Sequence, residues 1–223
     1  MRQHIAIIAA HPDDEVLGFG GTIARYADEG AGVDVLILAT GLAARGNPDA
    51  KARSALRAQA EQASKILGVN DLVFGDFPDN RMDGVDLLDV VKAVERFLDA
   101  RGVSEVYTHH AGDLNIDHQV CARAVLTACR PLPGSTLTRV LAGEVPSSSE
   151  YTGPDARFAP NIYNGISATL DRKCAALRCY EDELRPWPHP RSVEAVEALA
   201  GWRGSECGLE AAEAFRLLRE VSR

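Results

Sequence analysis

The chain has 223 residues, of which 46% are hydrophobic and 25% are charged, and its formal net charge is −8. This apolar fraction excludes intrinsic disorder, no apolar run approaches the roughly 20 residues of a membrane span, and an acidic chain without a basic stripe is not suited to nucleic acid. We therefore expect one globular domain over 1–223 that acts on a small molecule and binds neither nucleic acid nor membrane.

Short apolar runs alternate with longer amphipathic segments over residues 4–144, a pattern typical of βαβ units. Glycines at 18, 20 and 21 open the first predicted helix, and Gly30 ends it. Strands are predicted over 4–10, 33–38, 72–74, 103–108 and 136–144, and helices over 20–29, 50–67, 86–100, 117–130, 170–183, 191–200 and 209–221. The predicted fold class is α/β, with a doubly wound, mostly parallel sheet, helices on both faces and a helical C-terminal section.

Residues rich in Gly, Pro, Ser and Asn predict loops over 40–49 and 146–160. The five cysteines form no C-x-x-C pair, so we expect reduced, mostly buried thiols. Met1 is followed almost at once by the first predicted strand, without a leader pattern, which favours a cytoplasmic protein. Assembly into a homo-oligomer stays open.

Polar clusters follow two of the predicted strands. His11, Asp13 and Asp14 come directly after the first strand, and His118 lies in the polar segment after strand 103–108. Ligands of such sheets bind beyond the carboxyl ends of the strands, and a bound cation would relieve the repulsion between clustered carboxylates. Two histidines and a carboxylate form a ligand set for a catalytic divalent metal with one position open for water. The predicted ligands are His11, Asp14 and His118.

Asp13 is then a spare carboxylate beside the metal. A carboxylate in this place can act as a general base toward a water whose pKa the metal lowers, which is the chemistry of amide or ester hydrolysis. Each cluster alone has a structural explanation, since an aspartate after a strand often caps the next helix and a histidine can be a satisfied core residue. The two clusters together favour the metal.

The segment 10–15, Ala-His-Pro-Asp-Asp-Glu, and the following Leu-Gly-Phe-Gly-Gly-Thr resemble the signature of the PIG-L (LmbE-like) zinc-dependent N-deacetylases. Looser similarity continues in order through 67–68, 77–82, 113–118 and 188–192. The resemblance implies a Rossmann-like LmbE fold, Zn²⁺ held by His11, Asp14 and His118, and Asp13 as general base. It also implies removal of an acetyl group from an N-acetylated amino sugar.

The chain departs from this family at Asn115, where many members have a histidine. An asparagine can donate a hydrogen bond to a developing oxyanion but cannot deliver a proton. The general acid is therefore either Asp13 itself, once protonated, or a histidine from another loop, His189 or His110, of which we favour Asp13 and then His189. Asp117 is expected to hold an imidazole in orientation.

Three residues are candidates for substrate contacts. Arg57 lies on the predicted helix 50–67, near a position where the family often has arginine. Asp79 and Arg81 lie in a loop suited to sugar hydroxyls or a phosphate. The glycines at 18, 20 and 21 do not complete a G-x-G-x-x-G dinucleotide motif, so we expect them to allow close helix packing.

We therefore expect a zinc-dependent hydrolase that removes acetyl from an amino sugar, whether free, nucleotide-linked or glycosidic. The same ligands also suit Fe(II), Co(II) or Mn(II). One alternative is an amidase that acts on a thiol conjugate or an antibiotic intermediate through the same metal. Another is a non-catalytic sugar- or nucleotide-binding module, which would need neither metal nor Asp13.

Overall fold

The computed structural model describes residues 3–39 and 50–222. Seven strands in these residues form one sheet in the order β3-β2-β1-β4-β5-β7-β6. The first five run parallel, whereas β7 pairs antiparallel with both β5 and β6. The strands are β1 (His4–Ala9), β2 (Gly32–Ala39), β3 (Asp71–Phe77), β4 (Glu105–His109), β5 (Arg139–Gly143), β6 (Ile162–Gly165) and β7 (Ala212–Glu220). The strand order therefore reverses between β1 and β4, the place where such sheets bind ligands.

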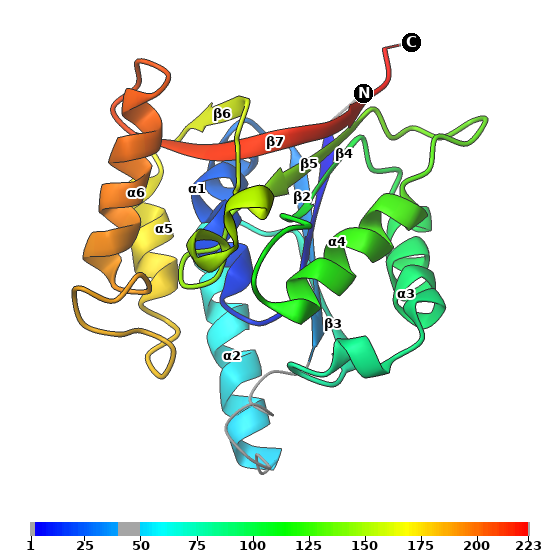
Figure 1. Ribbon diagram of the computed structural model, residues 1–223, viewed down its shortest axis with the longest axis horizontal. Helices are drawn as coiled ribbons and strands as arrows, with labels where there is room; N and C mark the ends of the chain where they lie inside the picture. Colours follow the sequence, from blue (N-terminus) through cyan, green and yellow to red (C-terminus); the bar gives the residue numbers. More distant parts are fainter. Residues whose placement is uncertain (1–2, 40–49, 223) are drawn as a thin grey trace.

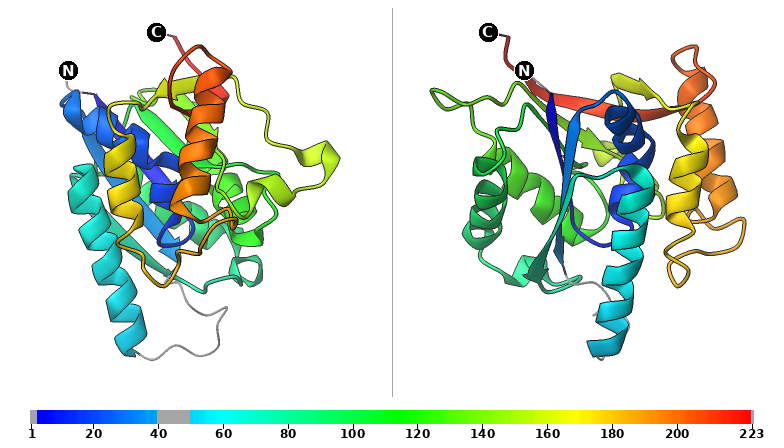
Figure 2. Two further views of the ribbon diagram at one scale, coloured as in Figure 1. Left: turned by 90° about the vertical axis from the view of Figure 1, so that its left-hand side faces the viewer. Right: turned by 180° about the vertical axis from the view of Figure 1, so that it is seen from behind.

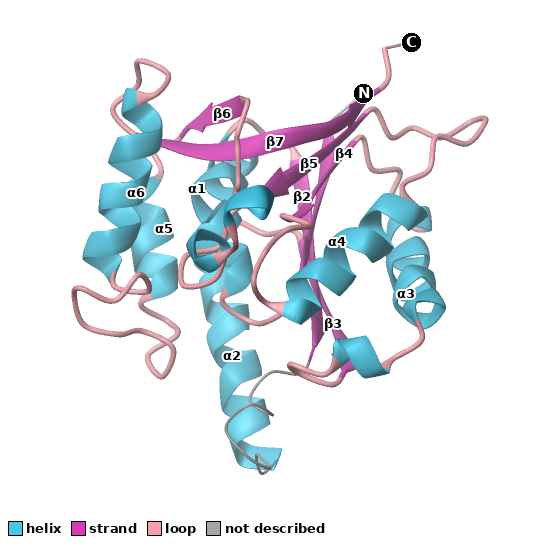
Figure 3. Ribbon diagram, in the orientation of Figure 1, coloured by secondary structure: helices cyan, strands magenta, loops and turns pink. Residues whose placement is uncertain are grey.

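Helices cover both faces of the sheet (Figure 1; Figure 3). One face is covered by α1 (Asp14–Asp28) and α2 (Ala50–Leu67), and α3 (Leu87–Asp99) and α4 (Ile116–Ala128) cover the other. Two further helices, α5 (Leu170–Leu177) and α6 (Val193–Ser205), form an outer layer, in which α5 packs on α1 and α2 (Figure 2). The predicted doubly wound α/β class is confirmed.

The apolar run of β1 follows from this layering. Ile5 and Ile7 belong to the core on the α1 side, whereas Ala6 and Ile8 belong to the core on the α3 side. Because successive side chains of a strand point to opposite faces, a strand covered on both sides is apolar at every position. This is why the strand shows no polar alternation in the sequence.

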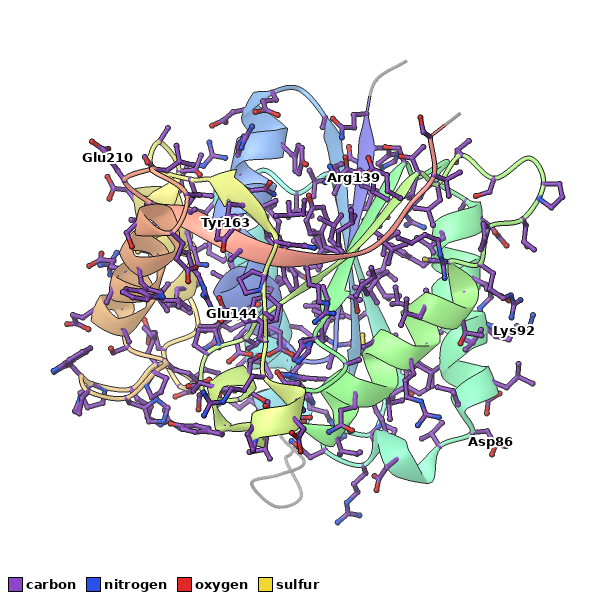
Figure 4. The ribbon with its side chains drawn as sticks, turned by 45° about the horizontal axis from the view of Figure 1, so that its top comes forward. Asp86, Lys92, Arg139, Glu144, Tyr163 and Glu210 are labelled. Carbon is purple, nitrogen blue, oxygen red and sulfur yellow. The ribbon has the colours of Figure 1, made fainter. Side chains whose placement is uncertain are left out.

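A partly buried ion pair joins the outer layer to the sheet. Glu144, which directly follows β5, accepts two hydrogen bonds from Arg203 of α6, at 2.7 and 2.8 Å. In Figure 4 the Glu144 side chain lies below β7. The pair fixes α6 against the edge of the sheet that lies beyond β5.

The glycines of α1 allow close packing, as predicted. A Cβ at Gly21 would lie 2.7 Å from Ile166 Cδ1, and one at Gly18 would lie 3.0 Å from the carbonyl oxygen of Glu144. The helix can approach its neighbours this closely only without side chains at these positions. The nucleotide-loop alternative finds no support here.

Three predictions about secondary structure are wrong. The first helix begins at Asp14 rather than at 20, and α5 ends at Leu177 rather than at 183. The segment 209–221 was expected to be a helix because it is rich in Ala, Leu, Glu and Arg, but it forms β7, since pairing with β5 and β6 outweighs local propensity. Strand β6 lies within a stretch without a prediction.

The C-terminal section is therefore helical only up to Ser205. The predicted loop 40–49 lies outside the described residues. The loop 146–160 holds only two short 3-10 turns, η3 (Ser149–Tyr151) and η4 (Pro154–Ala156), among its described residues. In the described chain, no helix is both long and apolar enough to cross a bilayer. The five cysteines are free thiols, and three of them are buried, in agreement with the prediction.

Candidate active site

The two predicted clusters meet at the switch point of the sheet. One turn leads from β1 into α1 and carries His11, Asp13 and Asp14, and the loop from β4 into α4 leads to His118. Since β1 and β4 are neighbouring parallel strands, both turns lie at the same edge. The imidazole rings of His11 and His118 lie 5.3 Å apart, centroid to centroid, although 107 positions separate them in the chain.

His11, Asp14 and His118 can hold a single ion. Oδ2 of Asp14 lies 3.2 Å from His11 Nδ1 and 3.1 Å from His118 Nε2, and the ligand atoms of the three residues lie within 4.8 Å of one another. Tetrahedral ligands about 2.1 Å from one ion are about 3.4 Å apart. The cluster therefore has the dimensions and the donor set of a divalent metal site.

Unsatisfied polar atoms lie in this cluster. Asp14 is 0% and His118 is 1% exposed, yet Asp14 Oδ1 and both ring nitrogens of His118 have no hydrogen-bond partner in residues 3–39 and 50–222. Buried polar atoms without partners are rare because each costs roughly 1–3 kcal/mol. A cation coordinated by Asp14 and by His118 Nε2 would supply a partner on this side of the ring, whereas His118 Nδ1 faces Asp113 Oδ1, at 3.2 Å, so the residues present fit a metal.

The charges of the cluster point the same way. Burial works to lower the pKa of His11 and of His118, but neighbouring carboxylates outweigh it and raise these values to about 10 and about 9. Burial works to raise the pKa of Asp14, but the imidazoles of His118 and His11 bring it well below its usual range. The surroundings therefore strongly favour positive charge between these side chains.

Asp13 lies beside this cluster and is 1% exposed. Its Oδ2 accepts a hydrogen bond from Nη1 of Arg191, at 3.0 Å, and the same nitrogen lies 3.4 Å from Glu183 Oε2. Burial raises the pKa of Asp13 well above its usual range, with Arg191 opposing the rise. A buried carboxylate that readily takes up a proton is suited to general-base work.

Two further aspartates hold the imidazoles from behind. Asp117 Oδ2 lies 3.0 Å from His11 Nε2, and the carboxylate also accepts the backbone N–H groups of Asn80, at 2.6 Å, and Met82, at 2.9 Å. Asp113 Oδ1 lies 3.2 Å from His118 Nδ1. Asp117 thus has the geometry that an imidazole-orienting residue requires.

A third histidine, His109, lies against the cluster, with its Nε2 3.6 Å from Asp14 Oδ2. Its ring stacks on that of His118 at 3.9 Å, and its Nε2 accepts the backbone N–H of Ala10, at 2.8 Å. Burial lowers the pKa of His109 to about 3, so this imidazole is neutral. It adds a packing surface without adding charge.

The remaining predicted site residues differ in their exposure and in whether they contact the cluster. Asn115 caps α4 through Oδ1 and donates from Nδ2 to Asn80 Oδ1, at 3.1 Å. Asp79 is 4% exposed and lies 3.3 Å from His11 Nε2, whereas Arg81 is exposed. Arg57 is also exposed, and its guanidinium lies 4.9 Å from the ring centre of Phe74.

His189 is half-buried, and its Nδ1 accepts the backbone N–H of Arg191, at 3.0 Å. The side chain in this loop that contacts Asp13 is Arg191, which was not among the predicted site residues. Arg191 belongs to the segment 188–192 quoted for the family resemblance, so its position was marked even though its role was not. Asp113, likewise, lies in a quoted segment without a predicted role.

The sequence matches the PIG-L family model, described as GlcNAc-PI de-N-acetylase, over residues 6–129, more than half of the chain. This chain belongs to the PIG-L family. A relative covered almost from end to end is the Uncharacterized deacetylase YaiS of Escherichia coli, which is 31% identical over 79% of this chain and 90% of its own. Family membership identifies the protein as an enzyme of the deacetylase type.

Other PIG-L relatives include a Probable N-acetyl-alpha-D-glucosaminyl L-malate deacetylase 2 of Bacillus cereus, 24% identical over 82% of this chain and 84% of its own. Among solved structures, GalB, the 4-carboxy-2-hydroxymuconate hydratase of Pseudomonas putida, superposes with a TM-score of 0.81 over 99% of this chain and 98% of its own, at 23% identity. The second similarity confirms the fold.

Proposed function

We propose that this PIG-L protein hydrolyses the acetamide of an N-acetylated amino sugar and uses Zn²⁺ held by His11, Asp14 and His118. The observation that carries the proposal is the buried carboxylate of Asp13, which lies next to the three-residue cluster and is paired with Arg191 at 3.0 Å. A binding module or a structural metal site has no use for such a spare carboxylate.

A divalent metal in this cluster would polarise the acetyl carbonyl and lower the pKa of a water molecule. Asp13 removes a proton from the attacking water, and its environment lets it retain that proton. The same carboxyl group then delivers the proton to the leaving amine, as a base and acid in turn. Arg191 keeps the carboxylate in one orientation through both steps.

The hydrogen bonds of His189 and Asn115 support smaller roles for both residues. His189 has its Nδ1 occupied by the backbone of Arg191, so only Nε2 is left to reach the leaving amine. Asn115 uses Oδ1 as a helix cap and retains one amide hydrogen beyond its bond to Asn80, which we assign to the oxyanion. Asp13 is therefore our choice as the main proton donor.

Substrate contacts are proposed at the rim of the site. Asp79 is close enough to His11 to accept a sugar hydroxyl there, and Arg57 and Arg81, both exposed, would meet more distant parts of the substrate. The N-acetylglucosaminyl group in the name of the Bacillus cereus relative supports an amino sugar as the acetylated unit. The five free thiols are consistent with a reducing, cytoplasmic location, and self-association stays a prediction.

The test is a screen of N-acetylated amino sugars, free, nucleotide-linked and glycosidic, for release of a primary amine and acetate, with and without a chelator. We expect stoichiometric release that stops when metal is removed and returns with Zn²⁺. Release of an amine from a thiol conjugate or an antibiotic intermediate instead would identify the alternative amidase.

Hydration of a carbon–carbon double bond is a second candidate, because a hydratase shares this fold with a TM-score of 0.81. An activated water and a carboxylate that exchanges a proton serve both reactions. Unsaturated carboxylic acids should therefore be included in the screen, since hydration consumes them without forming an amine or acetate.

A further inference from the structure

The main chain of Asp13 has an unusual conformation. Its φ is 105° and its ψ is −31°, a combination that residues with a side chain rarely adopt. At the same time its carbonyl oxygen accepts the first backbone bonds of α1, from Val16 at 3.1 Å and Leu17 at 2.9 Å. The direction of the Asp13 carboxylate therefore depends on a backbone that must be held in place.

Glu15 restrains this backbone through a hydrogen bond. Its Oε2 accepts the N–H of Asp13, at 3.0 Å, and the side chain is 0% exposed. The other carboxylate oxygen, Oε1, accepts a hydrogen bond from the hydroxyl of Tyr180, which is also 0% exposed. Tyr180 follows α5 and is 165 positions away in the chain, so a remote segment fixes the carboxylate that fixes Asp13.

The side chain of Asp13 is held from the same region. Arg191 contacts Oδ2 at 3.0 Å, and Glu183, three residues after Tyr180, lies 3.4 Å from the same Arg191 nitrogen. Asp13 is thus fixed at its backbone through Tyr180 and Glu15, and at its carboxylate through Arg191. Both sets of contacts originate in residues 180–191. These residues lie outside the segment 6–129 that matches the family model.

We propose that Tyr180 and Glu15 are positioning residues that set the orientation of the Asp13 carboxylate, an inference that rests on the proposed function. A helix-capping role alone is the competing explanation, because Glu15 lies in the first turn of α1 and accepts the N–H of its cap residue. Capping would affect stability, whereas positioning affects turnover in a folded, metal-loaded enzyme.

The test compares Tyr180→Phe with Tyr107→Phe in the whole, zinc-loaded protein. Each change removes one buried hydroxyl that donates to a buried glutamate, which is Glu15 for Tyr180 and Glu105 for Tyr107. Tyr107 differs in that it lies on β4 and does not contact Glu15. Its hydroxyl is also 3.0 Å from that of Tyr26. We expect Tyr180→Phe to lower kcat at least about tenfold with KM and metal content unchanged, because small misplacements of a catalytic group cost up to about a hundredfold. Tyr107→Phe should leave kcat unchanged.

A second pair of variants serves if Tyr180→Phe does not fold. Glu15→Gln keeps an oxygen for the Asp13 N–H and should retain most of kcat, whereas Glu15→Ala should lose it. Equal kcat values for the Gln and Ala variants would overturn the inference, as would a Tyr180→Phe enzyme with wild-type kcat.

Amide hydrogen exchange at Asp13, followed by NMR, provides a measurement that does not depend on activity. We expect Tyr180→Phe to speed exchange at this amide about tenfold or more, with no such change in Tyr107→Phe. An unchanged exchange rate at the Asp13 amide in Tyr180→Phe would refute the proposal that Tyr180 and Glu15 restrain this backbone. If the wild-type protein releases no amine from any sugar while this exchange difference is present, the proposed function is wrong. The inference that Tyr180 and Glu15 restrain the Asp13 backbone is then still supported.

Discussion

Arg191 Nη1 donates a hydrogen bond to Asp13 Oδ2, at 3.0 Å, across 178 positions of the chain. The Arg191 side chain is partly exposed, at 26%, whereas the Asp13 side chain is 2% exposed. This pair joins the loop before α6 to the turn after β1, so that the C-terminal part of the chain contacts the side chain of the proposed base directly.

Replacing Arg191 should shift the pH dependence of the enzyme. Burial raises the pKa of Asp13 and Arg191 opposes the rise, so Arg191→Met should raise this pKa further. Because a base must be deprotonated, the acidic limb of the kcat/KM profile should move to higher pH. Arg191→Lys keeps the positive charge and should move the limb less. A Met variant with the wild-type limb would contradict the assignment of Asp13 or its coupling to Arg191.

Removing the carboxylate of Asp13 should abolish most turnover without removing the metal. General-base catalysis contributes about 10²- to 10⁴-fold, so Asp13→Asn should lower kcat by that order. Zinc content, measured by elemental analysis, should stay at the wild-type level. Asp86→Asn is a matched control, because Asp86 also precedes a helix and lies on the surface (Figure 4). Near-normal turnover in Asp13→Asn would require a different base.

Removing a ligand should empty the metal site. His118→Ala leaves two of the three ligands, so the purified variant should contain little zinc and show no chelator-sensitive activity. His4→Ala is the control, since His4 also pairs with a buried aspartate, Asp34 at 2.8 Å. His4 lies at the amino end of β1, whereas the metal site follows the carboxyl end. Elemental analysis of both variants decides the matter, and full zinc occupancy in His118→Ala would refute the ligand set.

Most of the fold could be predicted because its signals are local. Helix α2 matches its predicted span, 50–67, since an amphipathic run ends at Gly68, whose φ of 82° suits glycine. The segment of β7 carries no such signal. Its residues have high helix propensity, and only the pairing with β5 and β6 makes it a strand.

The residues of the candidate site also fall into those that the sequence could predict and those that it could not. His11, Asp14 and His118 were brought together from the sequence because strand ends of a parallel sheet meet at a shared edge. Arg191 and Tyr180 reach Asp13 and Glu15 because α5 packs on α1 and α2 and α6 packs on α5. No periodicity encodes a contact between a loop residue and a turn 178 positions earlier.

A buried ion pair also joins that C-terminal section to α1. Lys173 of α5 contacts Glu213 of β7 at 2.5 Å, with side chains 5% and 4% exposed, and its Nζ also donates to the carbonyl oxygen of Leu17, at 2.8 Å. Glu213 in turn accepts the backbone N–H groups of Gly21 and Thr22 in α1. The pair therefore connects α5, β7 and α1.

Lys173→Met should destabilise the protein by about 3–5 kcal/mol, because it leaves the carboxylate of Glu213 buried without its cation. Urea unfolding followed by circular dichroism measures this, with an unchanged m-value showing that the same surface is exposed on unfolding. The control is Lys92→Met on α3, whose pair with Glu95 has a similar length, 2.7 Å, but a lysine that is 57% exposed on the surface (Figure 4). Exposed pairs contribute little, so this variant should lie within about 0.5 kcal/mol of the wild type. Equal losses in the two variants would mean that the buried pair is not what holds the C-terminal section in place.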